Sequence, residues 1–317
     1  SIVHYWYLCW LIPFSIFQPR LSMLWISVSS ALYFLTNYYA DTSAYWHLPI
    51  WASALQWLPF FILLGYEWLQ RNSFASKLSA AEPVDGYDVV IPIYKDYNIL
   101  KTCLAGISSL RTKPHRVYVV DADSAQPQSV DMSGEIQVRW LHSELGRGNQ
   151  IARGVKAATS DVIVVLHADS TLNQDSACRI IAYLNANPES VGGVLGQRFD
   201  QGKVGLFIIE ILNDLRAVFG STGFGDQVQF FRRKAIKQAG GFPSIPLMED
   251  VETSWRLRKV GALGFLDAPV ISSSRSWLKT GFFKRLFTVL SCVARYRIAR
   301  IRGENNAEEL YQYYYKS

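Results

Sequence analysis

The chain has 317 residues, enough for one large domain or two small ones. Hydrophobic residues make up 50% of the chain and charged residues 18%, a balance too apolar for a wholly water-soluble protein of this length. The four cysteines show no paired spacing, which argues against a disulfide framework or a zinc site and favours a reducing compartment.

The apolar excess lies in the first 70 positions. Leu21–Ala40 and Ile50–Leu69 are each about twenty mostly apolar residues, the length that a helix needs to cross a bilayer. Arg20 and Arg71 flank these stretches, whereas the linker between them has no Lys or Arg, so the linker should face outward. A buried helical hairpin in a soluble protein is the alternative.

We therefore predict that residues 1–76 form a membrane segment, with the end of one span followed by two transmembrane helices. The first ten residues contain no basic run, so we expect no signal peptide and a fragment of a longer membrane protein. The predicted location is the cell (inner) membrane, in a multi-pass protein whose globular domain is cytoplasmic.

From Asp85 onward, short apolar runs alternate with amphipathic stretches. The runs predict strands over 88–93, 116–120, 136–141, 161–166, 191–199 and 227–232. The stretches predict helices over 98–110, 148–159, 176–187, 204–219 and 248–260. This alternation is typical of an α/β fold with a mostly parallel sheet whose two faces are covered.

Polar groups follow several of these elements. Asp121, Asp123 and Asp169 come just after predicted strands, where open α/β sheets bind ligands. Arg147 lies in a glycine-rich turn before a helix, where main-chain N–H groups and the guanidinium could meet phosphates, although a flexible turn with a solvated Arg is the alternative. Glu249 and Asp250 begin a helix, a position that carboxylates also occupy simply to complement the helix dipole.

Together these segments resemble the family 2 glycosyltransferases with the GT-A fold. The motifs, in the family's order, are Val89-Val-Ile-Pro-Ile-Tyr94, Val119-Val-Asp-Ala-Asp-Ser124, His167-Ala-Asp169, Gly225-Asp-Gln227 and Gly240-Gly-Phe-Pro243 leading to Met248-Glu-Asp250. The similarity covers about residues 87–300, and its branch has Leu-His-Ala-Asp in place of the Asp-X-Asp motif.

The resemblance implies a nucleotide-sugar donor, bound first through its nucleoside. Asp121 and Asp123 compete for the role of the acidic residue that binds the nucleoside, because this chain has Asp-Ala-Asp where many relatives have Asp-Asp-Gly. Pro92 and Tyr94 are expected to shape the floor beneath the base. A turn-capping Asp is the alternative for Asp121.

The resemblance also implies a divalent cation, Mg²⁺ or Mn²⁺, bound by Asp169, which aligns with the family's metal-ligating carboxylate. His167 replaces the first Asp of that motif and is expected to lie beside the ribose. Arg147 is expected to lie near the donor's phosphates. Asp226 and Gln227 would line the acceptor side, although a polar turn is an equally reasonable interpretation for these two residues.

In catalysis, the resemblance makes Asp250 the general base and Glu249 its orienting partner or an acceptor contact. The implied function is a membrane-anchored, metal-dependent inverting glycosyltransferase that moves a single sugar to a hydroxyl of a lipid or glycan. Single transfer is expected because the Gln-X-X-Arg-Trp motif of polymerising relatives is missing. The alternatives are a polyprenyl-phosphate sugar synthase and a catalytically silent nucleotide-sugar-binding membrane scaffold.

The C-terminal part is rich in positive charge, since Arg275–Arg302 contains eight basic residues and no acidic one. Its apolar residues recur near helical spacing, which predicts a basic amphipathic helix and tail over 276–317. The net charge of +6 is consistent with an anionic membrane surface or with nucleic acid, and because the predicted spans place the domain at a bilayer, we expect a membrane surface as partner rather than nucleic acid. A packing helix with a solvated basic face is the alternative. The GT-A domain itself is predicted over 85–275.

Overall fold

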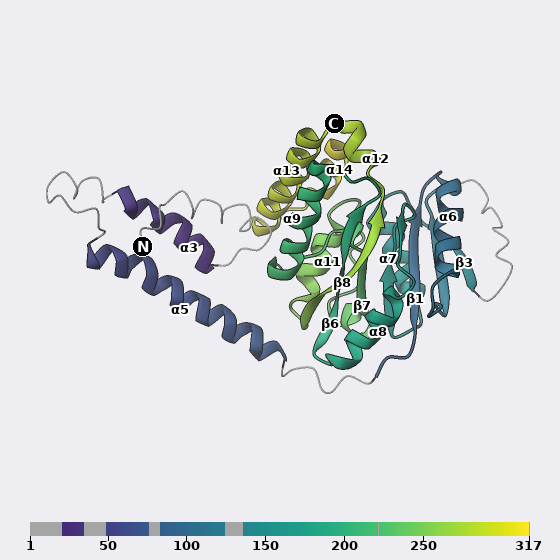
Figure 1. Ribbon diagram of the computed structural model, residues 1–317, viewed down its shortest axis with the longest axis horizontal. Coiled ribbons are helices and arrows are strands. Elements are labelled where there is room, and N and C mark those ends of the chain that lie inside the picture. The colour runs from purple at the N-terminus through teal and green to yellow at the C-terminus, as the bar shows by residue number, and fades with distance from the viewer. Residues whose placement is uncertain (1–20, 35–48, 76–82, 124–135, 221, 317) are drawn as a thin grey trace. The chain divides into compact units, whose positions relative to one another are not determined.

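The computed structural model describes residues 21–34, 49–75, 83–123, 136–220 and 222–316 (Figure 1). The chain divides into two compact units, Ser1–Ser76 and Lys77–Ser317. In the first unit, α3 (Leu21–Ser29) continues into the 3-10 helix η1 (Ser30–Phe34) and packs against α5 (Ile50–Ala75). The indole nitrogen of Trp25 in α3 donates hydrogen bonds to two carbonyl oxygens of α5, at 3.2 Å and 3.1 Å.

The predicted multi-pass membrane localisation is contradicted. Across the described residues, no helix combines the length and the apolar character needed to cross a membrane. α3 ends after nine residues, and α5, although 26 residues long, contains Pro59 and the polar residues Gln56 and Glu67, which lower its apolar character. Other parts of the predicted spans, within 1–20 and 35–48, lie outside the described residues.

The second unit is built around one eight-stranded sheet in the order β3-β2-β1-β4-β7-β6-β8-β5. The strands are β1 (Tyr87–Ile93), β2 (Arg116–Asp121), β3 (Gln137–His142), β4 (Val162–Val165), β5 (Ser170–Thr171), β6 (Ser190–Phe199), β7 (Gln229–Arg232) and β8 (Ala262–Ser272). β1 pairs in parallel with β2 and β4, β2 pairs in parallel with β3, and β6 pairs in parallel with β8. β7 is antiparallel to both of its neighbours, β4 and β6. The sheet is therefore mixed and mostly parallel, as predicted.

Helices cover the sheet. They are α6 (Tyr97–Ser108), α7 (Arg147–Ala157), α8 (Ser176–Ala186), α9 (Val204–Gly220), η2 (Gly225–Gln227), α10 (Arg233–Gln238), α11 (Glu249–Leu257), α12 (Arg275–Thr280), α13 (Phe282–Ile301) and α14 (Ala307–Lys316). Successive strand residues point to opposite faces. Val89 therefore packs with Leu100 of α6 and Ile180 of α8, whereas Val90 packs with Ile151 of α7. Two cores result, one on each face.

The C-terminal region differs from the single basic helix that the sequence predicts. Gly281, with a φ of 89°, separates α12 from α13, and α14 follows as a third helix. α13 buries Cys292, Val293 and Tyr296 against the rest of the unit, and Phe283 stays exposed. The packing face of α13 agrees with the alternative interpretation of this segment.

This topology positions the candidate site. Because β1, β2 and β4 run in parallel, their carboxyl ends share one edge of the sheet, and the loops that follow them lie near one another. These loops carry Tyr94, Asp123 and Asp169.

Candidate active site

The backbone adopts an unusual conformation beside several predicted site residues. Among the described residues, the non-glycine positions with positive φ are Lys95 (60°), Val228 (53°) and Met248 (67°). Each directly adjoins a predicted site residue in the sequence. Left-handed backbone is unfavourable for side-chain-bearing residues, most of all for a β-branched one, and it gathers at functional sites.

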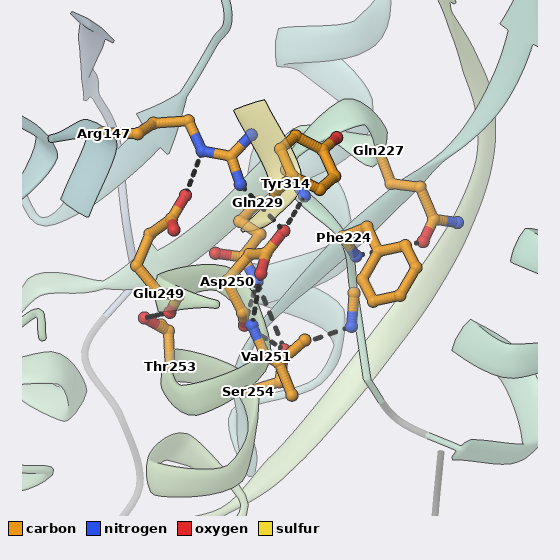
Figure 2. A network of polar contacts seen from close by, with 12 residues as sticks. Arg147, Phe224, Gln227, Gln229, Glu249, Asp250, Val251, Thr253, Ser254 and Tyr314 are labelled. Atoms are coloured by element: carbon orange, nitrogen blue, oxygen red, sulfur yellow. Dashed lines mark hydrogen bonds and ion pairs between the residues drawn. The ribbon is translucent and has the colours of Figure 1, made fainter. Parts of the chain in front are cut away.

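Asp250 is held by main-chain donors from two elements (Figure 2). Its Oδ2 accepts a hydrogen bond of 2.7 Å from the N–H of Gly225 in η2, and its Oδ1 accepts one of 2.7 Å from the N–H of Val251. The Nη2 of Arg147 lies 3.7 Å from the same Oδ2. The side chain is only slightly exposed, so its position is fixed by the protein rather than by solvent.

Arg147 joins the two carboxylates of α11 to α7. Its Nε donates to Oε1 of Glu249, which is fully buried, and the other Glu249 oxygen has no hydrogen-bond partner in the described part of the chain. Burial raises the pKa of Glu249 to about 7, although the charge of Arg147 acts against this shift. We predicted Arg147 as a phosphate contact, but the structure pairs it with Glu249 and Asp250.

The turn before α7 is built to let α11 approach. Gly148, at the start of α7, faces the carbonyl oxygen of Ile245 and the Cβ of Glu249, and a side chain at Gly148 would overlap both. The glycine-rich turn therefore serves close packing between α7 and the segment that leads into α11.

His167 belongs to the same cluster. It follows β4 and lies buried against η2, where an added Cβ at Gly225 would come within 2.7 Å of its ring. Burial, and next the positive charge of Arg147, lower the pKa of His167 to about 3, so the imidazole is neutral. Its Nε2 has no hydrogen-bond partner among the described residues.

A further carboxylate of the site, Asp169, is influenced by the charge of another, Asp226. Asp169 follows β4 and Asp226 lies in η2, and both residues are exposed overall. Desolvation by surrounding protein atoms, and then the negative charge of Asp226, raise the pKa of Asp169 to about 6. In the described residues, no group of three or more His, Cys, Asp or Glu side chains gathers as a metal site. Carboxylate oxygens such as those of Asp169 are nevertheless the kind of ligand that Mg²⁺ and Mn²⁺ take, with substrate phosphates as further ligands.

Gln227 is fully buried, and its side chain bonds to neighbouring protein groups. Its side-chain oxygen accepts hydrogen bonds from Arg216 at 2.5 Å and from the N–H of Phe224 at 3.4 Å, and its amide nitrogen donates to the carbonyl of Asn213. The guanidinium carbon of Arg216 lies 3.4 Å from the centre of the Phe224 ring. Gln227 thus fixes η2, which carries Gly225 and Asp226.

Sequence reasoning missed Arg216. It is a buried cation in α9, and burial lowers its pKa to about 9 although Asp250 and Asp226 oppose the shift. An Arg in a mostly apolar helix, one turn after Asn213, is the signal that could have identified it.

The predicted nucleoside end lies at the carboxyl ends of β1 and β2. Oδ2 of Asp121 accepts a hydrogen bond from the hydroxyl of Tyr97 at 2.8 Å, and Oδ1 accepts one from the N–H of Asp123 at 2.8 Å. Tyr97 was not predicted. Tyr94 is 44% exposed, and Pro92 is half-buried within β1. The bonds to Asp121 agree with the turn-capping alternative for that residue.

The chain is similar in sequence to known glycosyltransferases. Residues 88–238 match the family model described as glycosyl transferase family 2. The chain is 20% identical over 211 residues to a poly-beta-1,6-N-acetyl-D-glucosamine synthase of Staphylococcus epidermidis, covering 61% of this chain and 51% of the relative. It is 19% identical over 197 residues to the synthase of that name from Staphylococcus aureus strain MW2, covering 57% of this chain and 47% of the relative.

A solved structure shares the fold. The mannosyltransferase PcManGT from Pyrobaculum calidifontis, in complex with GDP-Man and Mn2+, matches with a TM-score of 0.53 at 17% identity, covering 80% of this chain and 76% of that one. The match over residues 88–238, just under half of the chain, supports the predicted resemblance to the family 2 glycosyltransferases, and the mixed sheet is GT-A-like. The chain spans about half the length of the curated relatives it matches.

Proposed function

We propose that the second unit transfers one sugar from a nucleotide-diphosphate sugar to an acceptor hydroxyl, with inversion at the anomeric carbon. The observation that carries this proposal is the fixed carboxylate of Asp250, which accepts hydrogen bonds from the N–H groups of Gly225 and Val251 at the edge of the sheet. A base held in this way needs no reorganisation when the acceptor arrives.

In the proposed reaction, the acceptor oxygen attacks the anomeric carbon from the side opposite the diphosphate, and its proton passes to Asp250. The bond between the anomeric carbon and the phosphate oxygen breaks, and the diphosphate leaves with the electron pair. The positive charge of Arg147 reduces the repulsion between the carboxylates of Glu249 and Asp250, because its guanidinium interacts with both of them. Glu249 therefore positions Arg147, which in turn positions the base.

Asp169 and Asp226 are the residues that would hold a Mg²⁺ or Mn²⁺ ion. Carboxylates such as these fit a cation that takes its other ligands from the donor's phosphates. The bound ion would offset the charge that develops on the leaving diphosphate. Mn²⁺ is the first ion to test, because the structural relative from Pyrobaculum calidifontis binds it together with GDP-Man.

The names of the sequence relatives suggest a donor and an acceptor for the first test. Because those relatives are synthases of poly-beta-1,6-N-acetyl-D-glucosamine, we choose UDP-N-acetylglucosamine as donor and a β-1,6-linked N-acetylglucosamine tetrasaccharide as acceptor. A glycan acceptor is preferred to a lipid on this basis. Transfer of a single sugar remains our proposal.

The experiment measures UDP release by the purified chain with Mn²⁺, with and without the tetrasaccharide, and repeats it with GDP-mannose. We expect release that depends on acceptor and metal, a product one sugar longer by mass spectrometry, and a β-linkage by NMR. Donor binding without release would instead favour the silent scaffold, and release only with polyprenyl phosphate as acceptor would favour the lipid-linked alternative.

A further inference from the structure

The C-terminal helix brings aromatic rings to the candidate active site. Tyr311, Tyr314 and Tyr315 of α14 share one helix face, since they are three and four positions apart. The Tyr311 and Tyr315 ring centroids are 4.7 Å apart, and those of Tyr314 and Tyr315 are 5.2 Å apart. This face was not part of any sequence prediction.

Tyr314 reaches the carboxylate end of the site. Figure 2 shows its ring beside Arg147 and Asp250. Burial raises the pKa of Tyr314 to about 12, and the phenol also interacts electrostatically with Asp226 and Arg147. α14 thus borders the carboxylate end of the site through Tyr314.

The Tyr314 ring is held in a defined place. Arg285 of α13 donates a hydrogen bond to its hydroxyl, and the guanidinium carbon of Arg285 lies 4.1 Å from the ring centroid. Leu310 is fully buried, and Glu309 forms an ion pair with Arg295 of α13. α14 is therefore a docked helix rather than a loose tail.

α13, on which α14 docks, is also bonded to α11, the helix that carries Asp250. Glu252, two positions after Asp250 on α11, is nearly fully buried. It accepts hydrogen bonds from Arg300 of α13 at 2.6 Å and from Arg256 at 2.8 Å, and the hydroxyl of Tyr296 donates to it at 3.3 Å. Through Glu252, α13 fixes the relative position of the candidate base and of α14.

We propose that α14 forms one wall of the acceptor subsite and that the ring of Tyr314 packs against the acceptor sugar whose hydroxyl approaches Asp250. This inference rests on the proposed function. A sugar ring has an apolar C–H face, which an aromatic ring complements, and polar hydroxyls, for which the carboxylate of Asp250 beside the Tyr314 ring offers a partner. The acceptor is the sugar concerned, because the donor's nucleoside is expected at the other end, near Tyr94.

The test compares three variants of the full chain. Tyr314→Ala removes the ring, Tyr314→Phe keeps it, and Tyr313→Ala is the matched control, because Tyr313 lies on the same helix but its ring faces Arg295, with 5.3 Å between guanidinium carbon and ring centroid. The probe is the β-1,6-linked N-acetylglucosamine tetrasaccharide, titrated by calorimetry in the presence of UDP and Mn²⁺, and used as acceptor for KM and kcat with UDP-N-acetylglucosamine.

We expect Tyr314→Ala to raise the Kd and the acceptor KM about tenfold, the loss that removal of an aromatic contact of this size produces. Tyr313→Ala should match the wild type, and Tyr314→Phe, which keeps the ring but loses the hydrogen bond from Arg285, should raise the Kd and the acceptor KM less than Tyr314→Ala does. The donor KM should not change in any variant. An unchanged tetrasaccharide Kd in Tyr314→Ala, or no tetrasaccharide binding by the wild type, would refute the proposal that Tyr314 lines the acceptor subsite. A failure of the proposed function would give a different result: the wild type would release no UDP, whatever its Kd for the tetrasaccharide.

Discussion

The two ends of the candidate site are held by different kinds of contact. At the carboxylate end, Asp250 is fixed by two main-chain N–H groups, and Arg147 links it to the buried Glu249. At the nucleoside end, Asp121 is bonded within its own turn and to Tyr97, and the ring of Tyr94 is largely exposed.

The difference corresponds to two tasks. A group that takes part in bond making must be in place before the substrate arrives, because displacements of about 1 Å can lower rates a hundredfold. A surface that receives a nucleoside can instead be completed by the ligand, which covers an exposed ring such as that of Tyr94. The comparison therefore predicts effects on turnover at one end and on donor affinity at the other.

The largest effect is expected from Asp250→Asn. Without a base, kcat should fall by about 10²–10⁴-fold, with the donor KM little changed. Asp121→Asn should do the reverse, raising the donor KM with kcat retained. Steady-state kinetics on both variants tests the comparison directly. Near-normal turnover in Asp250→Asn would exclude Asp250 as the base and leave Glu249 and Asp226 as candidates.

Asp169→Asn should come next, with transfer lowered roughly 10²-fold through loss of metal-assisted departure of the diphosphate. Activity measured against Mn²⁺ concentration should lose its metal dependence. Asp161→Asn is the matched control, because Asp161 is an exposed carboxylate just before β4, whereas Asp169 follows that strand. Full activity of Asp169→Asn in the presence of a chelator would refute a metal at this carboxylate.

Arg147→Ala should destabilise the fold, because it leaves Glu249 buried without its cation. We expect the free energy of unfolding to fall by about 2 kcal/mol at pH 8, less than the ~3–5 kcal/mol of a fully buried broken pair, since Arg147 is partly exposed. The pKa of Glu249 is raised to about 7 in the folded state, so its protonated form favours folding below that pH and the benefit is lost as the pH rises.

The loss in Arg147→Ala should therefore be smaller at pH 5, where Glu249 is neutral, than at pH 8. Adding Glu249→Gln should remove the difference between the two pH values. Denaturant unfolding of the single and double variants at both values provides the measurement, and equal losses at both pH values in Arg147→Ala would contradict the assignment.

Much of the fold could be predicted because its strands are apolar runs between amphipathic helices. The observed bounds of β1, β2 and β4 differ from the predicted ones by one residue at most at either end. β8 was missed, because Gly264, Asp267 and Pro269 interrupt its apolar pattern. The membrane spans were predicted from the length, apolar composition and flanking basic residues of 21–40 and 50–69, whereas in the structure α3 ends after nine residues and Gln56, Pro59 and Glu67 interrupt the apolar sequence of α5.

The site could be predicted only where one short segment carries the chemistry. The order of the motifs predicts roles for Asp250 and Asp169, which stay predictions, but the pairing of Arg147 with Glu249 spans 102 residues and depends on how α7 packs on α11. Likewise, nothing local in the sequence shows that Gln227 turns inward or that Tyr314 reaches Arg147. These contacts depend on packing between elements that are distant in the sequence, which the hydrophobic pattern within one helix or strand does not predict.

The smallest predicted effect tests how tightly the carboxylate end is packed. In Gly225→Ala, the new Cβ would lie 2.7 Å from the His167 ring and 3.5 Å from Oδ2 of Asp250, so one of the three must move. We expect a loss of about 1 kcal/mol in the free energy of unfolding, the low end for overpacking, together with a lower kcat because the N–H that holds Asp250 shifts. Gly202→Ala is the matched control, since an added Cβ at Gly202 meets no atom within 4 Å. Equal stability and turnover in the two variants would mean that η2 can yield without disturbing the base, and that the carboxylate end is no more rigid than the nucleoside end.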